Sequence, residues 1–118
     1  MARVFEQPRS FVGSRYEETR TLDIREIAKL VRAEVKAAFP DKKTSIRIER
    51  YAGGQSLHVR MIDCDPAFVS AEGRSARTEL NRIAQQYNFD FSDVEQDYFH
   101  VRFFVEVEVQ GPRDPVSG

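Results

Sequence analysis

Residues 44–62, TSIRIERYAGGQSLHVRMI, form two segments of alternating apolar and polar side chains on either side of a glycine pair. Alternation with period two predicts β-strands that bury one face. Gly53 and Gly54 allow the positive φ angles of a two-residue hairpin turn. Such a turn fixes a register in which apolar residues face apolar ones and polar residues face polar ones, with Arg50 opposite Leu57 as the one misfit. The matched pairs are Ile48 with Val59, Ile46 with Met61, Glu49 with His58, Arg47 with Arg60, and Tyr51 with Ser56. The sequence therefore predicts a β-hairpin with one apolar and one polar face.

An amphipathic helix is predicted over residues 23–39, before the hairpin. Asp23 is a suitable N-cap, and Glu26 three residues later completes a capping box. Pro40 ends the helix, because the residue before a proline avoids the α conformation. Four basic residues recur at helical spacing outside the apolar stripe and form a basic ridge: Arg25, Lys29, Arg32 and Lys36.

The second half of the chain predicts helical segments followed by a long strand. Asp65 and Pro66 fit the N-cap and first position of a helix, which we expect to be short over residues 67–72 and interrupted near Gly73. A further helix then runs to Tyr87. Residues 98–109 alternate strictly, which predicts a strand: Phe99, Val101, Phe103, Val105, Val107 and Val109 on one face, and His100, Arg102, Phe104, Glu106 and Glu108 on the other.

These elements predict one α+β domain of order α-β-β-α-β, in which an antiparallel sheet of hairpin and C-terminal strand carries two helices on one face. We expect residues 1–22 to form an N-terminal arm or edge strand, residues 23–110 the domain, and residues 111–118 a flexible tail. The 118 residues include one cysteine, so no internal disulfide is possible. No apolar run approaches the length of a membrane helix. We expect a cytoplasmic protein without a membrane association.

The polar face of this sheet holds most of the side chains that could take part in binding or catalysis. Tyr, Phe and Arg on such a surface are typical of protein interfaces and also of single-strand nucleic-acid sites. Both histidines, His58 and His100, lie on this face, and with Glu49 or Glu106 they could hold a metal. The acidic run Asp90–Asp97 is a second possible cation site, but it lacks the spacing of a calcium-binding loop. No nucleophile or oxyanion loop accompanies these groups, so we expect neither an enzyme nor a cofactor.

Several motifs together resemble a large polyvalent protein-associated domain of phages, plasmids and other mobile elements. The resemblance covers roughly residues 24–105. It rests on the helix run that leads to Phe39-Pro40, on Ser45-Ile46-Arg47, on residues 51–59, on Tyr87-Asn88, on Ser92-Asp93 and on residues 97–101. Members travel with anti-restriction and DNA-processing modules, so the resemblance implies a setting and no catalytic residues. Met61 and Asp65 stand where the family pattern has an aromatic residue and a glycine.

We therefore expect a non-enzymatic accessory protein of a phage or mobile element that acts in the host cytoplasm. It would bind a host or defence protein, or a protein–nucleic-acid complex, and act by occlusion. The expected contact residues lie on the polar sheet face: Arg47, Tyr51, His58, Arg60, Arg102 and Phe104. The alternative is a nucleic-acid-binding module that uses the basic ridge and the N-terminal arginines. A metal-dependent enzyme is a third possibility, and residues 101–109 could form a homodimer if they lie at a sheet edge.

Overall fold

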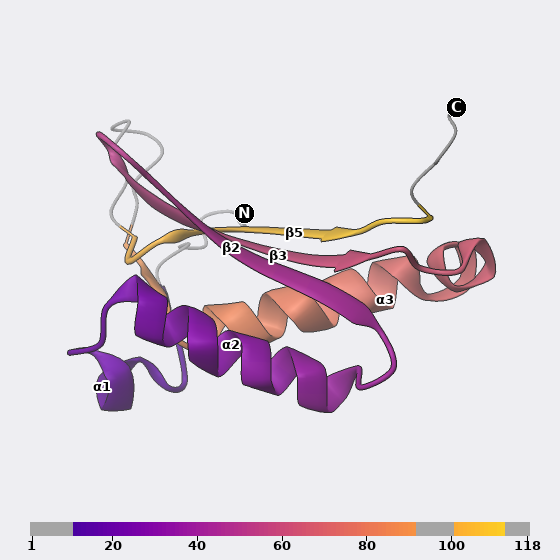
Figure 1. The fold of residues 1–118 in the computed structure, drawn as a ribbon. Helices are drawn as coiled ribbons and strands as arrows, with labels where there is room; N and C mark the ends of the chain where they lie inside the picture. Colours follow the sequence, from indigo (N-terminus) through magenta and orange to yellow (C-terminus); the bar gives the residue numbers. More distant parts are fainter. Residues whose placement is uncertain (1–10, 92–100, 113–118) are drawn as a thin grey trace, which may run out of the picture.

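The computed structural model describes residues 11–91 and 101–112, and it has an α+β fold in which helices cover one face of a sheet (Figure 1). The larger sheet has three strands in the order β2-β3-β5, and a small two-stranded sheet joins β1 to β4. The elements, in chain order, are β1 (Phe11–Val12), α1 (Tyr16–Thr19), α2 (Ile24–Ala38), β2 (Lys43–Tyr51), β3 (Gly54–Ile62), α3 (Pro66–Gln85), β4 (Phe89–Asp90) and β5 (Phe104–Val109).

The helix α2 forms as the sequence predicts. The Asp23 side chain accepts a hydrogen bond from the backbone N–H of Glu26, and the Glu26 side chain accepts one from the Asp23 N–H. This capping box satisfies two amide groups that the first turn leaves without helical partners. Phe39 is the C-cap, directly before Pro40.

The hairpin keeps its predicted faces, but its register differs from the prediction by two residues. Ile46 pairs with Val59 and Ile48 with Leu57, because Tyr51 already pairs with Gly54 and the turn consists of Ala52 and Gly53. A shift of two residues leaves every side chain on its own face, since side chains alternate with period two.

The orientation of the third strand was predicted wrongly. β5 runs parallel to β3, so that Leu57 lies beside Val105 and Val59 beside Val107. Parallel neighbours require a crossover connection, and α3 supplies it by packing against β5 and β3. The sheet is therefore mixed, with β3 between an antiparallel and a parallel neighbour.

α3 is one continuous helix, so the predicted interruption near Gly73 is also wrong. Asp65 caps it by accepting from the Ala67 N–H at 2.9 Å, and Pro66 is its first residue, as predicted. Gly73 lies inside the helix and is buried, and its nearest side-chain neighbour is Val69, one turn earlier. Apolar contacts made by the rest of the helix outweigh the cost of about 1 kcal/mol for a helical glycine.

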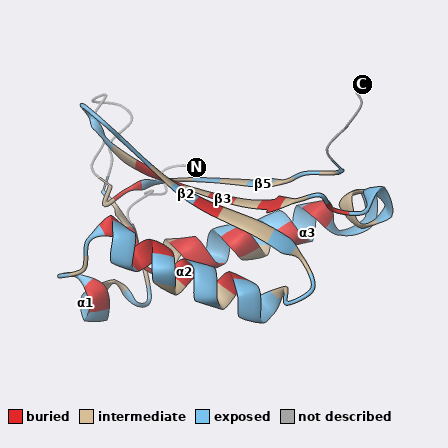
Figure 2. Cartoon of the chain, in the orientation of Figure 1, coloured by how far each residue is buried: buried red, intermediate tan, exposed pale blue. Residues whose placement is uncertain are grey.

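The core lies between the helices and the sheet, where Figure 2 shows the buried residues gathered on the facing surfaces. α2 packs against β2, and α3 packs against β5. The largest fully buried side chains come from both helices, from β3 and from the ends of the loops around them: Tyr87, Phe103, Ile27, Leu57, Met61, Leu80, Ile83, Val31, Val35 and Val59.

An N-terminal segment crosses the end of α3 and fastens there through the backbone. The N–H groups of Gly13 and Arg15 donate to the carbonyls of Asn88 and Gln86, each at 2.8 Å. A Cβ on Gly13 would lie 2.3 Å from the backbone oxygen of Gln86, so no other residue fits without moving the segment. We call this region, made of Gly13, Arg15, Thr19, Asn88 and Arg102, the N-terminal clamp.

Arg102 holds the clamp together by donating to backbone oxygens. Its guanidinium donates to the carbonyls of Tyr87 at 2.7 Å and Leu22 at 3.0 Å, and to the Thr19 carbonyl. It also donates to the Thr19 hydroxyl at 3.3 Å and lies 5.0 Å above the Tyr16 ring. Its burial lowers the pKa of the Arg102 guanidinium. The prediction that Arg102 lies on the polar face of the sheet is therefore wrong, because regular β5 begins only at Phe104.

Asn88 and Glu34 complete the polar contacts at this end of the domain. The Asn88 side chain donates to the Phe103 carbonyl at 2.9 Å and accepts from the Phe103 N–H at 3.2 Å. Glu34 accepts from Gln86 at 2.8 Å and from the Tyr87 hydroxyl. Burial, with the hydrogen bond to Glu34, raises the pKa of Tyr87.

Candidate partner-binding face

One face of the β2-β3-β5 sheet is uncovered by any helix or strand that the structure describes (Figure 1). We call it the open face. Side chains of alternate residues on the three strands form it, because the same parity that buries Ile46, Leu57 and Val59 directs their neighbours outward. Its residues are Arg47, Glu49, Tyr51, His58, Arg60, Phe104, Glu106 and Glu108.

The register sets these side chains in rows across the strands. Arg47, His58 and Glu106 form one row, and Arg60 and Glu108 form part of the next. The Arg60 Nε lies 3.5 Å from a carboxylate oxygen of Glu108. The basic side chains thus lie on β2 and β3, while β5 contributes carboxylates.

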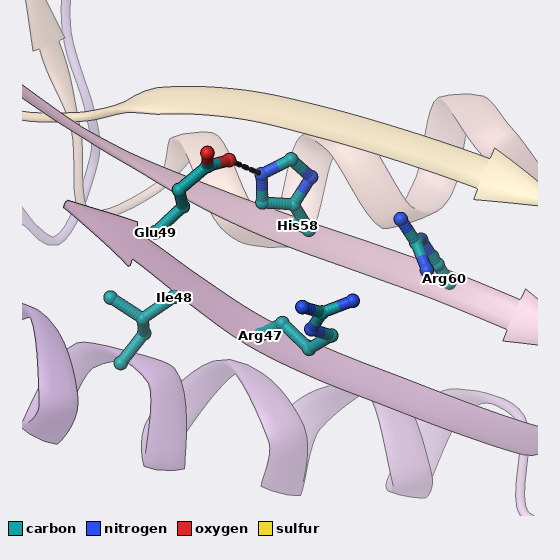
Figure 3. Close-up of a pocket in the computed structure, with 5 residues that line it drawn as sticks. All are labelled: Arg47, Ile48, Glu49, His58 and Arg60. Carbon is teal, nitrogen blue, oxygen red and sulfur yellow. Dashed lines mark hydrogen bonds and ion pairs between the residues drawn. The ribbon is translucent and has the colours of Figure 1, made fainter. Parts of the chain in front are cut away.

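His58 lies between two carboxylates. Its Nε2 is 3.0 Å from Glu49 Oε1, and its Nδ1 is 3.3 Å from Glu106 Oε1. Figure 3 shows the contact with Glu49 across β2 and β3. Only a doubly protonated ring donates to both carboxylates at once, because the neutral ring carries one N–H. The imidazole nitrogens point to opposite sides, so this arrangement links three strands and does not converge on one point.

Two shallow hollows lie on the open face and share Arg47 and Arg60. The first has a volume of about 230 Å³ and is lined by Arg47, Ile48, Glu49, His58 and Arg60 (Figure 3). The second, of about 320 Å³, is lined by Ser45, Arg47, Arg60, Ile62, Asp63, Gln110 and Gly111. Deep small-molecule sites are lined mainly by apolar and aromatic groups. These hollows are polar and shallow, and they suit side chains of a docked macromolecule better than a cofactor.

Arg47 differs from the other cations of this face. Within the described residues it makes no ion pair, whereas Arg60 has Glu108 and His58 has two carboxylates. Arg47 is exposed, and Figure 3 shows it on the side of β2 away from Ile48, which points toward the helices. Its guanidinium can therefore accept a new partner without breaking an existing contact.

Two exposed aromatic rings stand at the hairpin end of the open face. Tyr51 is 44% exposed and Phe104 is 36% exposed. Gly54 lies between them with φ +154°, and a Cβ there would be 3.6 Å from the Phe104 ring. The Tyr51 hydroxyl is hydrogen-bonded to Ser56 at 2.7 Å, which fixes the ring against the sheet.

The structure brings five of the six predicted contact residues to this face: Arg47, Tyr51, His58, Arg60 and Phe104. Arg102 belongs to the N-terminal clamp instead. His100 and most of the acidic run lie outside the described residues. In the described ranges, 11–91 and 101–112, no group of three or more His, Cys, Asp or Glu side chains is arranged to hold a metal ion.

The basic ridge of α2 is exposed as predicted: Arg25, Lys29, Arg32 and Lys36. Arg32 reaches across to β2 and donates to the Ile46 carbonyl at 3.3 Å. Of the N-terminal arginines, Arg3 and Arg9 lie outside the described residues. Arg15 is paired with Glu18 at 2.7 Å and Glu34 at 3.2 Å.

Sequence reasoning missed the N-terminal clamp. Gly13 looks like an ordinary loop glycine, Thr19 belongs to no motif, and Asn88 is part of the family resemblance without a structural role assigned to it. The one available signal was Asn88 at the end of the predicted helix, where side-chain amides often satisfy the last backbone groups.

The fold and its open face define a small α+β domain in which helices cover one face of the sheet and no described element covers the other. The family model of large polyvalent protein associated domain 29 matches residues 22–112. The chain therefore belongs to that family, as its motifs predicted, and it is a protein associated with phages and other mobile elements. No curated protein and no solved structure matches it significantly. No helix within the described residues is both long and apolar enough to cross a bilayer.

Proposed function

We propose that this domain is a non-enzymatic accessory protein that binds a host or defence protein through the open face. The observation that carries the proposal is the asymmetry of the sheet. Helices bury one face, whereas the other presents two exposed aromatic rings, Tyr51 and Phe104, beside Arg47, which makes no ion pair with any residue that the structure describes. Tyr and Arg dominate the binding energy of protein interfaces, and aromatic residues are enriched in them. Binding would act by occluding a functional surface of the partner.

The size of the open face limits what it can do alone. β2 and β3 are about 30 Å long and β5 about 20 Å, and at about 4.8 Å between strands the three give roughly 400 Å². A standard interface covers about 800 Å² on each partner. The partner would therefore extend beyond the open face, onto the hairpin tip or over a sheet edge.

Photo-crosslinking tests this proposal at the level of single positions. A benzophenone amino acid replaces Tyr51 or Phe104 in the protein produced in its host, and a third version carries it at Arg77, which is exposed on α3. We expect a discrete covalent adduct from the two open-face positions and none from position 77. Adducts of equal strength from all three positions would contradict the proposal.

A charge-reversal pair provides the matched control. The double variant Arg47→Glu with Arg60→Glu should abolish the adduct from Tyr51, whereas Arg25→Glu with Lys29→Glu changes the net charge equally and should preserve it. Circular dichroism and thermal unfolding of both variants show whether the fold is intact. Loss of the adduct only in the helix variant would move the site to α2.

Nucleic-acid binding by the basic ridge is the second candidate. Arg25, Lys29 and Lys36 are exposed on one side of α2 and, among the described residues, make no ion pair. Fluorescence anisotropy with single-stranded DNA, duplex DNA and RNA tests it at low and near-physiological salt. Four phosphate contacts would give a slope of log K against log salt of about −3.6 for duplex DNA. Absence of binding at low salt would remove this candidate.

A metal-dependent enzyme remains the third expectation. It would use the two histidines or the acidic run, and elemental analysis of the purified protein would show stoichiometric metal if it were correct.

A further inference from the structure

Within residues 11–91 and 101–112, no strand pairs with the outer edge of β2. β2 has one strand neighbour, β3, in the β2-β3-β5 order. In an antiparallel pair, backbone groups of alternate residues point to the neighbour or away from it. The Ile46 carbonyl points away, because Arg32 of α2 reaches it at 3.3 Å. Residues of the same parity therefore direct their N–H and C=O groups outward: Thr44, Ile46, Ile48 and Arg50.

Cations border this edge on both sides of the sheet. On the open face, Arg47 is exposed and unpaired among the described residues. Arg50 is exposed near the hairpin tip. On the helix side, Arg32 marks the part of α2 that faces the edge, and Lys29 and Lys36 lie one turn before and after it on the same side. Glu49 is the only carboxylate that β2 itself contributes.

The opposite edge of the sheet has the reverse charge. β5, Phe104–Val109, contributes Glu106 and Glu108 and no basic residue. The two edges present the same kind of backbone groups, so side-chain charge is what distinguishes the strands each can accept.

We propose that the outer edge of β2 binds an extended acidic peptide segment of a partner protein as a fourth strand. Outward backbone groups recognise another peptide backbone, which is the basis of strand addition. Side chains of the added strand would alternate between the two faces of the sheet and meet Arg47 on one side and Arg32 with Lys36 on the other. Successive carboxylates therefore find cations in turn.

Arg32 covers part of the edge when no peptide is bound. Its bond to the Ile46 carbonyl covers one outward acceptor, and a charge beside a sheet edge discourages unwanted pairing. An incoming strand would displace it from the carbonyl, and a carboxylate of that strand would become its new partner. The proposal concerns the edge of the sheet, so it stands or falls independently of binding at the open face.

Three fluorescein-labelled decapeptides test the proposal on the full chain. The first has the sequence TEEVTEEVTE, which places glutamates on both faces of an added strand, the second has lysine in place of each glutamate, and the third keeps the glutamates but is N-methylated at every residue, so that neither strand edge can donate. We expect only the first to bind, with the other two at least about tenfold weaker. Equal binding of the N-methylated peptide would overturn the proposal, because it would show attraction by charge alone.

Hydrogen exchange locates the binding at single residues. The amide protons of Thr44, Ile46, Ile48 and Arg50 point away from β3 and should gain protection in the peptide complex. Those of Ser45, Arg47 and Glu49 are already bonded to β3 and should change little. Binding of TEEVTEEVTE without new protection at Ile46 and Ile48 would place it elsewhere and refute the proposal.

Two further measurements exclude other occupants. Arg32→Gln should weaken the acidic peptide about fivefold or more while leaving the fold intact, since the only hydrogen bond that the guanidinium makes within the described residues is to the Ile46 carbonyl. A second copy of the chain is the competing occupant. If sedimentation shows dimers that TEEVTEEVTE dissociates, a second copy of the chain occupies this edge and the proposal is wrong. Tighter binding of a dT15 oligonucleotide than of the peptide would also overturn it.

Discussion

The N-terminal clamp and the open face contain the same kinds of residue and use them in opposite ways. In the clamp, Arg102 is partly buried and donates to the carbonyls of Thr19, Leu22 and Tyr87. On the open face, Arg47 is exposed and, in the part of the chain that the structure describes, makes no ion pair. Chain ends and helix ends leave carbonyls without partners, and an arginine nearby is drawn to them. Arg47 projects from β2 onto the open face, away from the backbone carbonyls at the strand's edge, so its guanidinium stays available.

The largest expected effect on stability comes from Arg102→Met, which we compare with the single variant Arg47→Met. Arg102→Met leaves three carbonyls without their donor and should lower the free energy of unfolding by about 3 kcal/mol. Arg47→Met should change it by no more than about 0.5 kcal/mol. Urea unfolding of both variants measures the difference. Similar losses would erase the distinction between the two regions.

Two glycine-to-alanine substitutions compare the backbone packing of the N-terminal clamp with that of α3. A methyl group at Gly13 would lie 2.3 Å from the Gln85 and Gln86 oxygens, so Gly13→Ala should destabilise the domain by about 2 kcal/mol. At Gly73 the nearest atom is Val69 Cγ1 at 3.6 Å, an ordinary contact. Gly73→Ala should therefore stabilise α3 by about 0.5–1 kcal/mol. Thermal unfolding tests both, and a stabilising Gly13→Ala would show that the clamp segment does not approach α3 so closely.

Tyr87 makes the clamp end of the domain sensitive to alkaline pH. Its pKa is raised in the folded protein, so the stability from its neutral form is complete below about pH 10 and is lost as the unfolded tyrosine ionises above it. Tyr87→Phe should cost about 1 kcal/mol at pH 7, because Glu34 loses a donor. Above pH 10 the wild type should lose up to about 1.4 kcal/mol per pH unit relative to the variant. Parallel stability curves from pH 7 to 11 would contradict this role.

The smallest effect is expected on the open face. His58→Gln removes contacts to Glu49 and Glu106, both of which are largely exposed. Surface pairs of this kind contribute about 0–1 kcal/mol, so we expect a loss below about 1 kcal/mol at neutral pH. Thermal unfolding in low and high salt measures it. A loss of about 3 kcal/mol would mean that His58 supports the fold as Arg102 does.

The sequence predicted the faces of the elements better than their connections. Alternation placed Ile46, Leu57 and Val59 in the core correctly, even though the turn begins one residue earlier than predicted and shifts the register by two. A register shift of two residues leaves a period-two pattern unchanged, so the pattern could not reveal it. Alternation is also the same whichever way a strand runs, so the pattern of Val105 and Val107 could not show that β5 runs parallel to β3.

Arg102 shows why the site was harder to predict than the fold. Alternation continues from Val101 to Val109 in the sequence, but the regular strand begins at Phe104. The position of Arg102 depends on carbonyls from Thr19 and Leu22, which lie some eighty residues away in the chain. No local pattern contains that information, whereas Arg47 and Arg60 lie within the hairpin and were placed on the correct face.

The parallel pairing of β3 with β5 also has a kinetic consequence. The hairpin joins neighbours such as Tyr51 and Gly54, and it can close quickly. Leu57 and Val105 meet only after the whole of α3 has been accommodated, and such distant pairing is entropically slow to close. β5 also leaves the ribosome after β2, β3 and α3. We therefore expect completion of the sheet by β5 to limit the folding rate, and β3 to be the strand most in need of protection while the chain is being made.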